Sequence, residues 1–194
     1  EKVTNTIVDF IRTKVDEQRK DGVALGLSGG VDSATAATLS VKAMAEPSKV
    51  HALYLFDRDS DKKFGKYAQE LAKELGIYFE AIDITPLMVQ HGVYSRLIMR
   101  QISMSAALNK LVVRSCKALC SLLHIPNPFV FTPKKRGRLR NRFTMSLGNA
   151  TAGTIAASFR VRHIQRRRIL EDYASQKNLL LIGTTNRSEY FVGW

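Results

Sequence analysis

The first half of the chain alternates between two hydrophobic patterns. Apolar residues at helical spacing mark three segments, residues 2–20, 34–45 and 61–75. Continuous apolar runs lie between them at residues 23–27, 50–56 and 77–82, and these runs predict buried strands. Buried strands that alternate with helices favour parallel pairing through right-handed crossovers. The pattern therefore predicts an α/β fold with a doubly wound parallel sheet, whose ligands bind at the carboxyl ends of the strands.

Breaker residues predict where the three helices end. Asp21-Gly22 ends the first, Pro47 stops the second and Gly76 closes the third. Glycine readily adopts the left-handed backbone found after helix C-termini, and proline cannot continue a helix.

The second half of the chain is more basic. We expect a mostly helical stretch from Thr85 to about Leu123, a break at residues 125–128, a basic loop at 134–142 and a helix from about Ala150 to Lys177. A further apolar run at residues 178–182 predicts the last strand. We expect one domain of residues 1–194, in which residues 85–162 form a basic helical and loop insertion.

The apolar runs are too short to cross a membrane. None approaches the roughly 20 residues that a spanning helix needs, and the amino-terminal segment is charged and amphipathic, unlike a signal peptide. We therefore expect a soluble, cytoplasmic protein. Cys116 and Cys120 are too few for a disulfide framework, and the favoured interpretation is a pair of small buried residues, with a reactive thiol pair as the alternative.

Positive charge is concentrated in the middle of the chain. The net charge is +13, and residues 84–170 contain sixteen Lys and Arg but no Asp or Glu. The other fourteen basic residues are outnumbered by the seventeen acidic ones. Such a block favours an anionic partner or the acidic surface of another subunit. We favour a subunit interface, and nucleic-acid binding is the alternative.

A corner rich in Ser and Gly joins the first apolar run to the second helix. It comprises Gly26, Leu27, Ser28, Gly29, Gly30, Val31, Asp32 and Ser33. Adjacent glycines adopt positive φ without steric cost and let several N–H groups converge on one oxyanion, while the helix dipole adds about half a positive charge. The two serines add hydroxyl donors. The corner therefore predicts a phosphate site, and the alternative is a plain strand-to-helix turn.

A carboxylate stands in this corner. Asp32 would repel bound phosphates unless a divalent cation lay between them, so it is a candidate Mg²⁺ ligand. In the alternative interpretation Asp32 is only a favourable charge at a helix N-terminus.

Polar residues also follow the other strands. Asp57-Arg58-Asp59-Ser60 comes after the second run, and Asp83 after the third. Arg58 is a candidate phosphate ligand, and Ser60 a candidate ligand of phosphate or ribose. Alternatively, these residues only cap the next helix.

The last apolar run leads into Gly183-Thr184-Thr185-Asn186-Arg187-Ser188-Glu189-Tyr190. Hydroxyl and N–H groups there would lie at the same sheet edge as the Ser/Gly corner. Glu189 offers a second oxygen ligand, so Asp32 and Glu189 could hold one Mg²⁺ between them. The alternative is a helix cap in which Glu189 completes a capping box.

The corner resembles the SGGxDS loop of the ATP pyrophosphatases. Its spacing differs from the Walker loop and from GxGxxG, and it has no lysine for a γ-phosphate. With residues 58–60, the Arg/Gln-rich helix and the Gly183–Glu189 segment, the chain resembles ammonia-dependent NAD synthetases. The resemblance covers most of residues 1–85 and 163–194, and it implies an adenine nucleotide alpha hydrolase-like fold.

The resemblance also implies roles for individual residues. Residues 26–33 bind the phosphates of ATP and Thr184 contacts ATP, while Asp32 and Glu189 bind Mg²⁺. Either Arg166 or Arg167 binds deamido-NAD. The chain departs from the family at Tyr67, where an Asp is usual, and in residues 84–162, which are longer and more basic. We also expect that the C-terminal part of the family domain is absent after Trp194.

On this resemblance we expect a ligase. The nicotinate carboxylate of deamido-NAD attacks the α-phosphorus of ATP, pyrophosphate leaves, and ammonia then displaces AMP to give NAD. Positioning and electrostatic stabilisation, without a covalent nucleophile, would carry catalysis. A homodimer is expected. The alternatives are a tRNA-modifying member of the same superfamily that transfers sulfur or an amine, and a non-catalytic nucleotide-binding relative.

Overall fold

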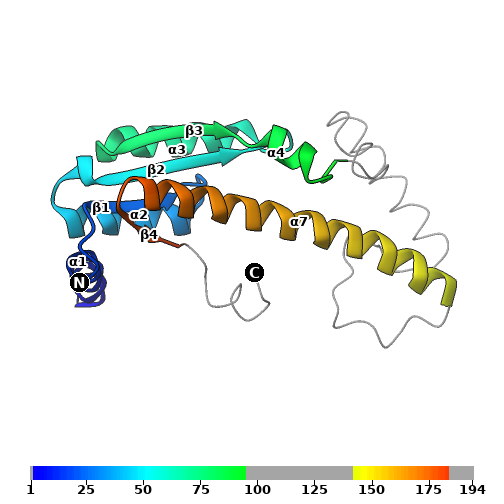
Figure 1. Cartoon of the computed structure of the whole chain (residues 1–194), viewed down its shortest axis with the longest axis horizontal. Coiled ribbons are helices and arrows are strands. Elements are labelled where there is room, and N and C mark those ends of the chain that lie inside the picture. Colours follow the sequence, from blue (N-terminus) through cyan, green and yellow to red (C-terminus); the bar gives the residue numbers. More distant parts are fainter. Residues whose placement is uncertain (1, 95–141, 184–194) are drawn as a thin grey trace. The chain divides into compact units, whose positions relative to one another are not determined.

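The computed structural model describes residues 2–94 and 142–183, with side chains from residue 158 onward in the second range. The elements are α1 (Lys2–Glu17), β1 (Gly22–Gly26), α2 (Val31–Met44), the 3₁₀ turn η1 (Pro47–Lys49), β2 (Val50–Phe56), α3 (Lys62–Leu75), β3 (Tyr78–Asp83), α4 (Thr85–Gln90), α7 (Arg142–Gln176) and β4 (Leu179–Ile182). Figure 1 labels these elements on a ribbon whose colours follow the sequence. Among the described residues, no helix combines the length and apolarity that a membrane crossing demands.

The chain divides into two compact units. One comprises residues 1–86 and 163–194, and the other residues 87–162. The first unit contains the sheet, and the rest of this section concerns that unit. The interpretation of the chain as a single domain with an insertion stays a prediction.

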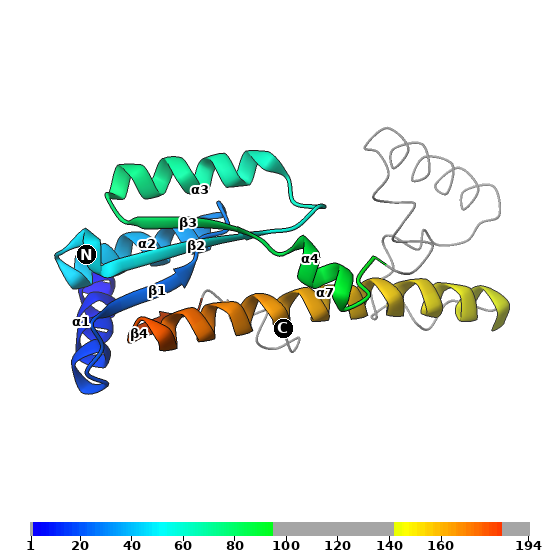
Figure 2. The same cartoon turned by 45° about the horizontal axis from the view of Figure 1, so that its top comes forward.

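The four strands form one parallel sheet in the order β3-β2-β1-β4. The chain moves outward from β1 through β2 to β3 and then returns to pair β4 with the other side of β1. Because right-handed crossovers put helices on opposite faces when the direction reverses, this order gives a doubly wound sheet. Figure 2 shows α3 on one side of the strands and the orange, carboxyl-terminal part of α7 on the other. The predicted fold class is confirmed.

β1 is buried on both faces. Val23 and Leu25, both 0% exposed, lie in a core with apolar residues of α1, α2 and α3. Ala24 packs on the other face with Ala174 of α7 and with Leu179. Side chains alternate along a strand, so a strand covered on both sides reads as a continuous apolar run. Burial of one leucine side chain contributes roughly 1.5–3 kcal/mol to this core.

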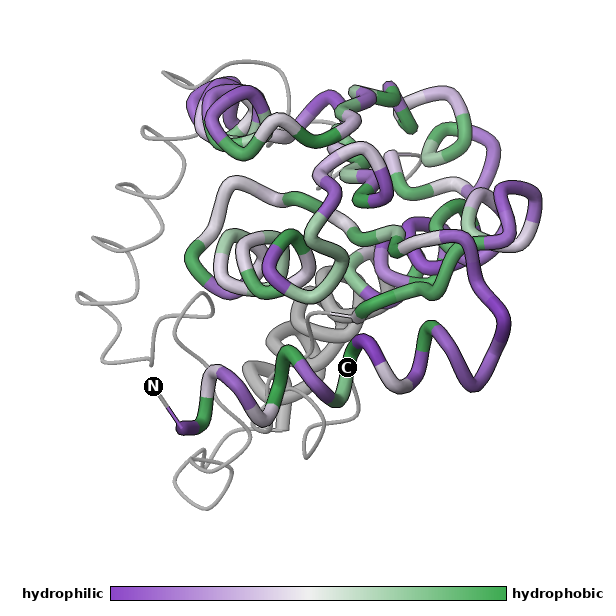
Figure 3. The backbone as a smooth tube through the Cα atoms, turned by 90° about the vertical axis from the view of Figure 1, so that its left-hand side faces the viewer, coloured by the Kyte–Doolittle hydropathy of each residue, from purple (hydrophilic) through white to green (hydrophobic). Residues whose placement is uncertain are grey.

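α1 packs against α2 and the core with one face only. Ile11 and Val15 are buried in the core, whereas Val3 and Phe10 are exposed. In Figure 3 the coils of α1, which begin at the label N, alternate between purple and green. This is the pattern of an amphipathic helix whose apolar stripe is partly covered.

The end of α3 follows its sequence signal, whereas α1 ends at Glu17, before the predicted break at Asp21-Gly22. Gly76 caps α3 with φ 67°, as predicted, and Asp61 caps its start by accepting a hydrogen bond from the Lys63 N–H. α2 begins at Val31, earlier than predicted, because Gly30 is extended and its carbonyl accepts the first helical bond from Ala34.

The prediction for the long helix was wrong at its start. α7 begins at Arg142 instead of about Ala150, so the end of the expected basic loop is helical. The rest of that loop, and the expected helix beyond α4 up to residue 123 with Cys116 and Cys120, lie outside the described residues.

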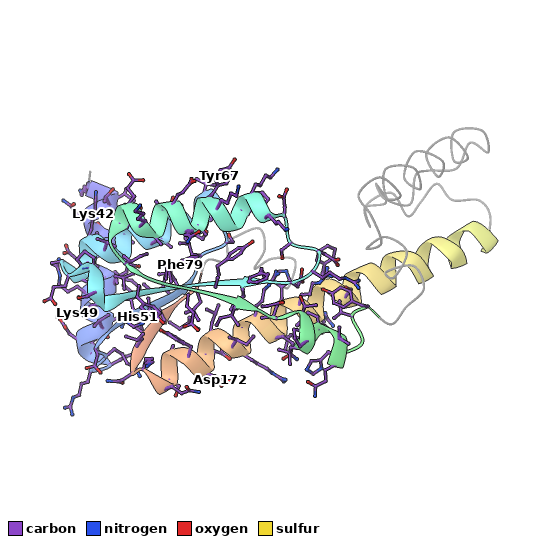
Figure 4. All side chains as sticks on the ribbon, turned by 90° about the horizontal axis from the view of Figure 1, so that it is seen from above. Lys42, Lys49, His51, Tyr67, Phe79 and Asp172 are labelled. Atoms are coloured by element: carbon purple, nitrogen blue, oxygen red, sulfur yellow. The ribbon has the colours of Figure 1, made fainter. Side chains whose placement is uncertain are left out.

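His51 joins β2, β3 and α7 at the amino end of the sheet. Its Nδ1 lies 2.8 Å from the Tyr173 hydroxyl, and its ring lies 4.8 Å from that of Tyr78. Figure 4 labels His51 beside the start of β2. Burial raises the pKa of Tyr173 to about 12, with Tyr78 and Glu80 adding to the rise, so its hydroxyl stays protonated at neutral pH.

This cluster predicts a pH dependence of stability. Burial, and then the positive charge of Lys177, lower the pKa of His51 below 6.5, so the unfolded chain binds this proton more readily. The free energy of unfolding should therefore fall as the pH drops below about 6.5. Denaturant unfolding between pH 7.5 and 5.5 measures this fall, which should be smaller in His51→Gln. The control is His91→Gln, at an exposed position. If both variants reduced the fall in the free energy of unfolding equally, His51 would not be its source.

Candidate ATP site at the carboxyl edge of the sheet

Two serines hold the Ser/Gly corner in shape. The Ser33 hydroxyl donates to the Gly30 carbonyl at 3.0 Å and accepts from the Ser28 N–H at 3.2 Å. The Ser28 hydroxyl lies 3.0 Å from that of Ser33 and accepts from the Gly30 N–H at 3.3 Å. Ser33 is only 2% exposed. In this structure the serine hydroxyls are used inside the loop, and their predicted contact with phosphate stays a prediction.

Gly29 lets the loop approach α3. Its φ is +79°, in the region that favours glycine, and an added Cβ would lie 2.3 Å from the Phe64 carbonyl oxygen. Phe64 belongs to the first turn of α3. A side chain at residue 29 would therefore push the loop away from that helix.

The start of α2 is open to an anion. Gly30 is the N-cap residue, and among residues 2–94 and 158–183 no side chain caps the N–H groups of the first turn. Val31 and Asp32 are exposed in that turn. Helix N-termini with unused N–H groups bind phosphate and carboxylate groups. The predicted residues 26–33 thus run from the last residue of β1, through a short loop, into the first turn of α2.

Asp32 is the acidic residue of this turn. Within the parts of the chain that the structure describes, its carboxylate makes no hydrogen bond or ion pair, and no cluster of three or more His, Cys, Asp or Glu could hold a metal ion. Its proposed partner, Glu189, and the ATP candidate Thr184 lie outside the described residues. The meeting of Asp32 with Glu189 therefore stays a prediction.

A second group of polar residues closes the turn after β2. Asp57, 5% exposed, accepts hydrogen bonds through Oδ1 from the Asp59 N–H and the Ser60 hydroxyl, both at 3.1 Å. The Ser60 hydroxyl also accepts from the Asp57 N–H at 3.0 Å. Arg58 lies 3.6 Å from the Asp59 carboxylate. Ser60 thus shapes this turn, and the roles of Arg58 and Ser60 toward ATP stay predictions.

The two arginine candidates of α7 lie differently. Arg166 Nη2 lies 3.7 Å from Asp57 Oδ2, so it reaches the turn after β2. Arg167 pairs with Glu171 of its own helix at 2.7 Å and its side chain is 78% exposed. The structure therefore brings Arg166, and not Arg167, to the polar turn at the carboxyl edge.

Sequence reasoning did not single out Asp57. The available signal was an acidic residue directly after a continuous apolar run, because such a residue stands at the carboxyl end of a buried parallel strand. Asp83 has the same position after β3, where its carboxylate accepts from the Thr85 N–H at 2.8 Å. Hydrogen bonding with the Thr85 hydroxyl, and then with this N–H, lowers the pKa of Asp83.

An open pocket of about 340 Å³ lies between α3 and the strands β2 and β3. Its walls are mostly aromatic or apolar, with two lysines among them. The lining residues include Tyr54, Phe56, Ser60, Lys62, Lys66 and Phe79. Through Ser60, the pocket adjoins the polar turn after β2.

Comparisons with known proteins agree with this arrangement. Residues 3–95 match the NAD synthase family. Over 188 residues, 97% of this chain, the sequence is 30% identical to the NH₃-dependent NAD⁺ synthetase of Thermotoga neapolitana. It is 28% identical over its whole length to that of Methanocaldococcus jannaschii. The chain spans only 59% and 55% of these two relatives.

Solved structures agree on the fold. The NH₃-dependent NAD synthetase of Campylobacter jejuni, solved with a nitrate ion, superposes with a TM-score of 0.57 at 28% identity, covering all of this chain and 59% of that one. The NMN synthetase of Francisella tularensis gives the same TM-score at 23% identity, covering 98% of this chain and 56% of that one. Residues 3–95 therefore match the NAD synthase family, and the chain as a whole is similar in sequence and fold to NH₃-dependent NAD⁺ synthetases.

Proposed function

We propose that this protein is an ammonia-dependent NAD⁺ synthetase. The observation that carries the proposal is the loop of residues 26–33, held in shape by Ser28 and Ser33 and open at the start of α2, within the segment that matches the NAD synthase family. The proposed substrates are ATP, deamido-NAD and ammonia. The relatives named above favour this function over a tRNA-modifying enzyme or a non-catalytic nucleotide-binding protein, because all are NAD or NMN synthetases.

The reaction has two steps. A carboxylate oxygen of deamido-NAD attacks the α-phosphorus of ATP, and the bond from this phosphorus to the bridging oxygen breaks, which releases pyrophosphate. Ammonia then attacks the carbonyl carbon, loses a proton, and displaces AMP to leave the amide. N–H groups of Val31, Asp32 and Ser33, in the first turn of α2, would bind the phosphates, and Arg166 would bind deamido-NAD. Preorganised donors of this kind stabilise developing negative charge without covalent chemistry.

Mg²⁺ fits the donor chemistry at this loop. The exposed Asp32 carboxylate stands in the first turn of α2, where bound phosphates would face it. Carboxylates and phosphate oxygens are the usual ligands of this ion. We propose Asp32 and Glu189 as its protein ligands. When bound, the ion would neutralise charge on the phosphates.

A pyrophosphate-release assay tests the function. The purified protein is supplied with ATP, Mg²⁺ and ammonium, and with deamido-NAD, nicotinic acid mononucleotide or nicotinic acid as the acid. We expect pyrophosphate and NAD⁺ in equal amounts with deamido-NAD, and little release with the other two acids. Release that prefers nicotinic acid mononucleotide would assign the activity named for the Francisella structure. No release with any acid would contradict the proposal.

Two further expectations accompany the function. By resemblance to the family we propose that the protein is a homodimer and acts in the cytoplasm. Sedimentation of the purified protein tests the first, since a monomer at micromolar concentration would contradict it.

A further inference from the structure

We propose that Asp57 is a positioning residue that holds Arg166 toward the dinucleotide substrate. The inference rests on the proposed function and deepens it, since it concerns how the side chain of Arg166 is oriented toward the substrate. Asp57 itself is too buried to meet a substrate, with 3% of its side chain exposed, whereas 33% of the Arg166 side chain is exposed.

Three contacts fix the direction of α7 on the sheet. Tyr173 meets His51 near the start of β2, Leu170 packs over Gly26 at the end of β1, and Arg166 meets Asp57 just after β2. The helix therefore runs opposite to the strands, and Arg166 lies one turn beyond Leu170, past the carboxyl edge. Since Gly26 is in register with Leu53, the loop after β1 and the turn after β2 begin at the same edge.

The Asp57 carboxylate cannot easily turn away from Arg166. Its Oδ1 is held by the Asp59 N–H and the Ser60 hydroxyl, and its other oxygen, Oδ2, faces the guanidinium. A buried charge that hydrogen bonds hold in place is an effective partner for a cation, because it does not move when the cation binds a substrate.

Arg166 keeps donors for a ligand. A guanidinium has five N–H donors in a fixed fork, and Asp57 faces it with one oxygen. Its Nε is buried and has no acceptor within the described residues, so the terminal nitrogens are the donors that a ligand could meet. Arg166 thus has one terminal nitrogen paired with Asp57 at 3.7 Å, and its partly exposed side chain has further charged donors, which suits the phosphates or carboxylate of a dinucleotide.

A competing role for Asp57 predicts the opposite change in the KM for deamido-NAD. If Asp57 were a counter-ion that competes with the substrate for Arg166, its removal would lower the KM for deamido-NAD. If Asp57 positions Arg166, its removal raises this KM, because a misplaced binding group loses its contacts with the substrate.

The test is Asp57→Asn, which removes the charge but keeps the oxygen that accepts from Ser60. We expect the KM for deamido-NAD to rise at least about tenfold, with the KM for ATP within about twofold of wild type. The matched control is Asp61→Asn, which removes a nearby exposed charge and retains the helix cap. If Asp57→Asn does not fold, Asp57→Ser takes its place with the same expected result.

A double-mutant cycle separates positioning from a purely structural role. In an Arg166→Ala background, Asp57→Asn should change the KM for deamido-NAD by less than about twofold, since its effect acts through Arg166. If the two substitutions have additive effects on the KM for deamido-NAD, the inference is overturned. An unchanged or lowered KM in Asp57→Asn alone would overturn it as well. In both cases turnover by the wild-type protein would still support the proposed function. A wild-type protein without turnover would instead overturn the proposed function, and the inference with it.

Discussion

Asp32→Asn should reduce ATP-dependent turnover at least about 100-fold and leave the fold intact. The exposed carboxylate stands in the first turn of α2, beside the loop proposed to bind the phosphates. Asparagine keeps the size of the side chain but supplies no negative charge to a divalent cation. Loss of one group that stabilises charge in a transition state costs roughly 10²–10³ in rate. Steady-state rates at saturating ATP, with Mg²⁺ varied, measure the effect.

Stability measurements distinguish this role from a structural one. As a charge at a helix N-terminus, Asp32 contributes only about 0.3–1 kcal/mol, so Asp32→Asn should lower the free energy of unfolding by no more than that. Asp9→Asn removes another exposed charge, from α1 and far from the loop in sequence, and should retain full turnover. If Asp32→Asn bound and used ATP with Mg²⁺ within about twofold of wild type, the assignment of Asp32 as a metal ligand would be refuted.

The sheet was predictable because strands that are buried on both faces have a recognisable sequence pattern. Val23, Leu25 and Leu53 lie in strands covered by helices on both sides, and strands of this kind read as unbroken apolar runs. Helix ends were also predictable where a single residue decides them, as Gly76 does after α3. The start of α7 was not, because a basic, polar segment carries no apolar stripe that would separate helix from loop.

The site was predictable only in its local part. The Ser/Gly corner is contiguous, so its conformation follows from residues 26–33 alone. The internal hydrogen bonds of Ser28 and Ser33 could not be foreseen, since a serine hydroxyl serves a ligand or its own backbone equally well. The Asp57–Arg166 pair depends on the packing of α7 against the sheet, which no local pattern encodes.

Gly29→Ala should destabilise the protein by about 2–5 kcal/mol and abolish most of its turnover. A left-handed backbone costs an alanine roughly 1–2 kcal/mol, and overpacking adds about 1–3 kcal/mol. Here the new Cβ would lie 2.3 Å from the Phe64 carbonyl oxygen and 2.9 Å from its carbonyl carbon. The loop would have to leave α3, and its N–H groups would no longer converge on one anion. Denaturant unfolding and the pyrophosphate assay measure the two effects.

The neighbouring glycine is the matched control. Gly30 has φ −92°, and the nearest atom to an added Cβ is the Ser28 hydroxyl oxygen at 3.4 Å, an ordinary contact. Gly30→Ala should therefore cost less than about 1 kcal/mol of stability. Phe64→Ala should not rescue Gly29→Ala, because the clash is with the main chain of residue 64 and not with its ring. Equal stability of the two glycine variants, or rescue by Phe64→Ala, would mean that the close approach of the loop to α3 does not hold the phosphate site in shape.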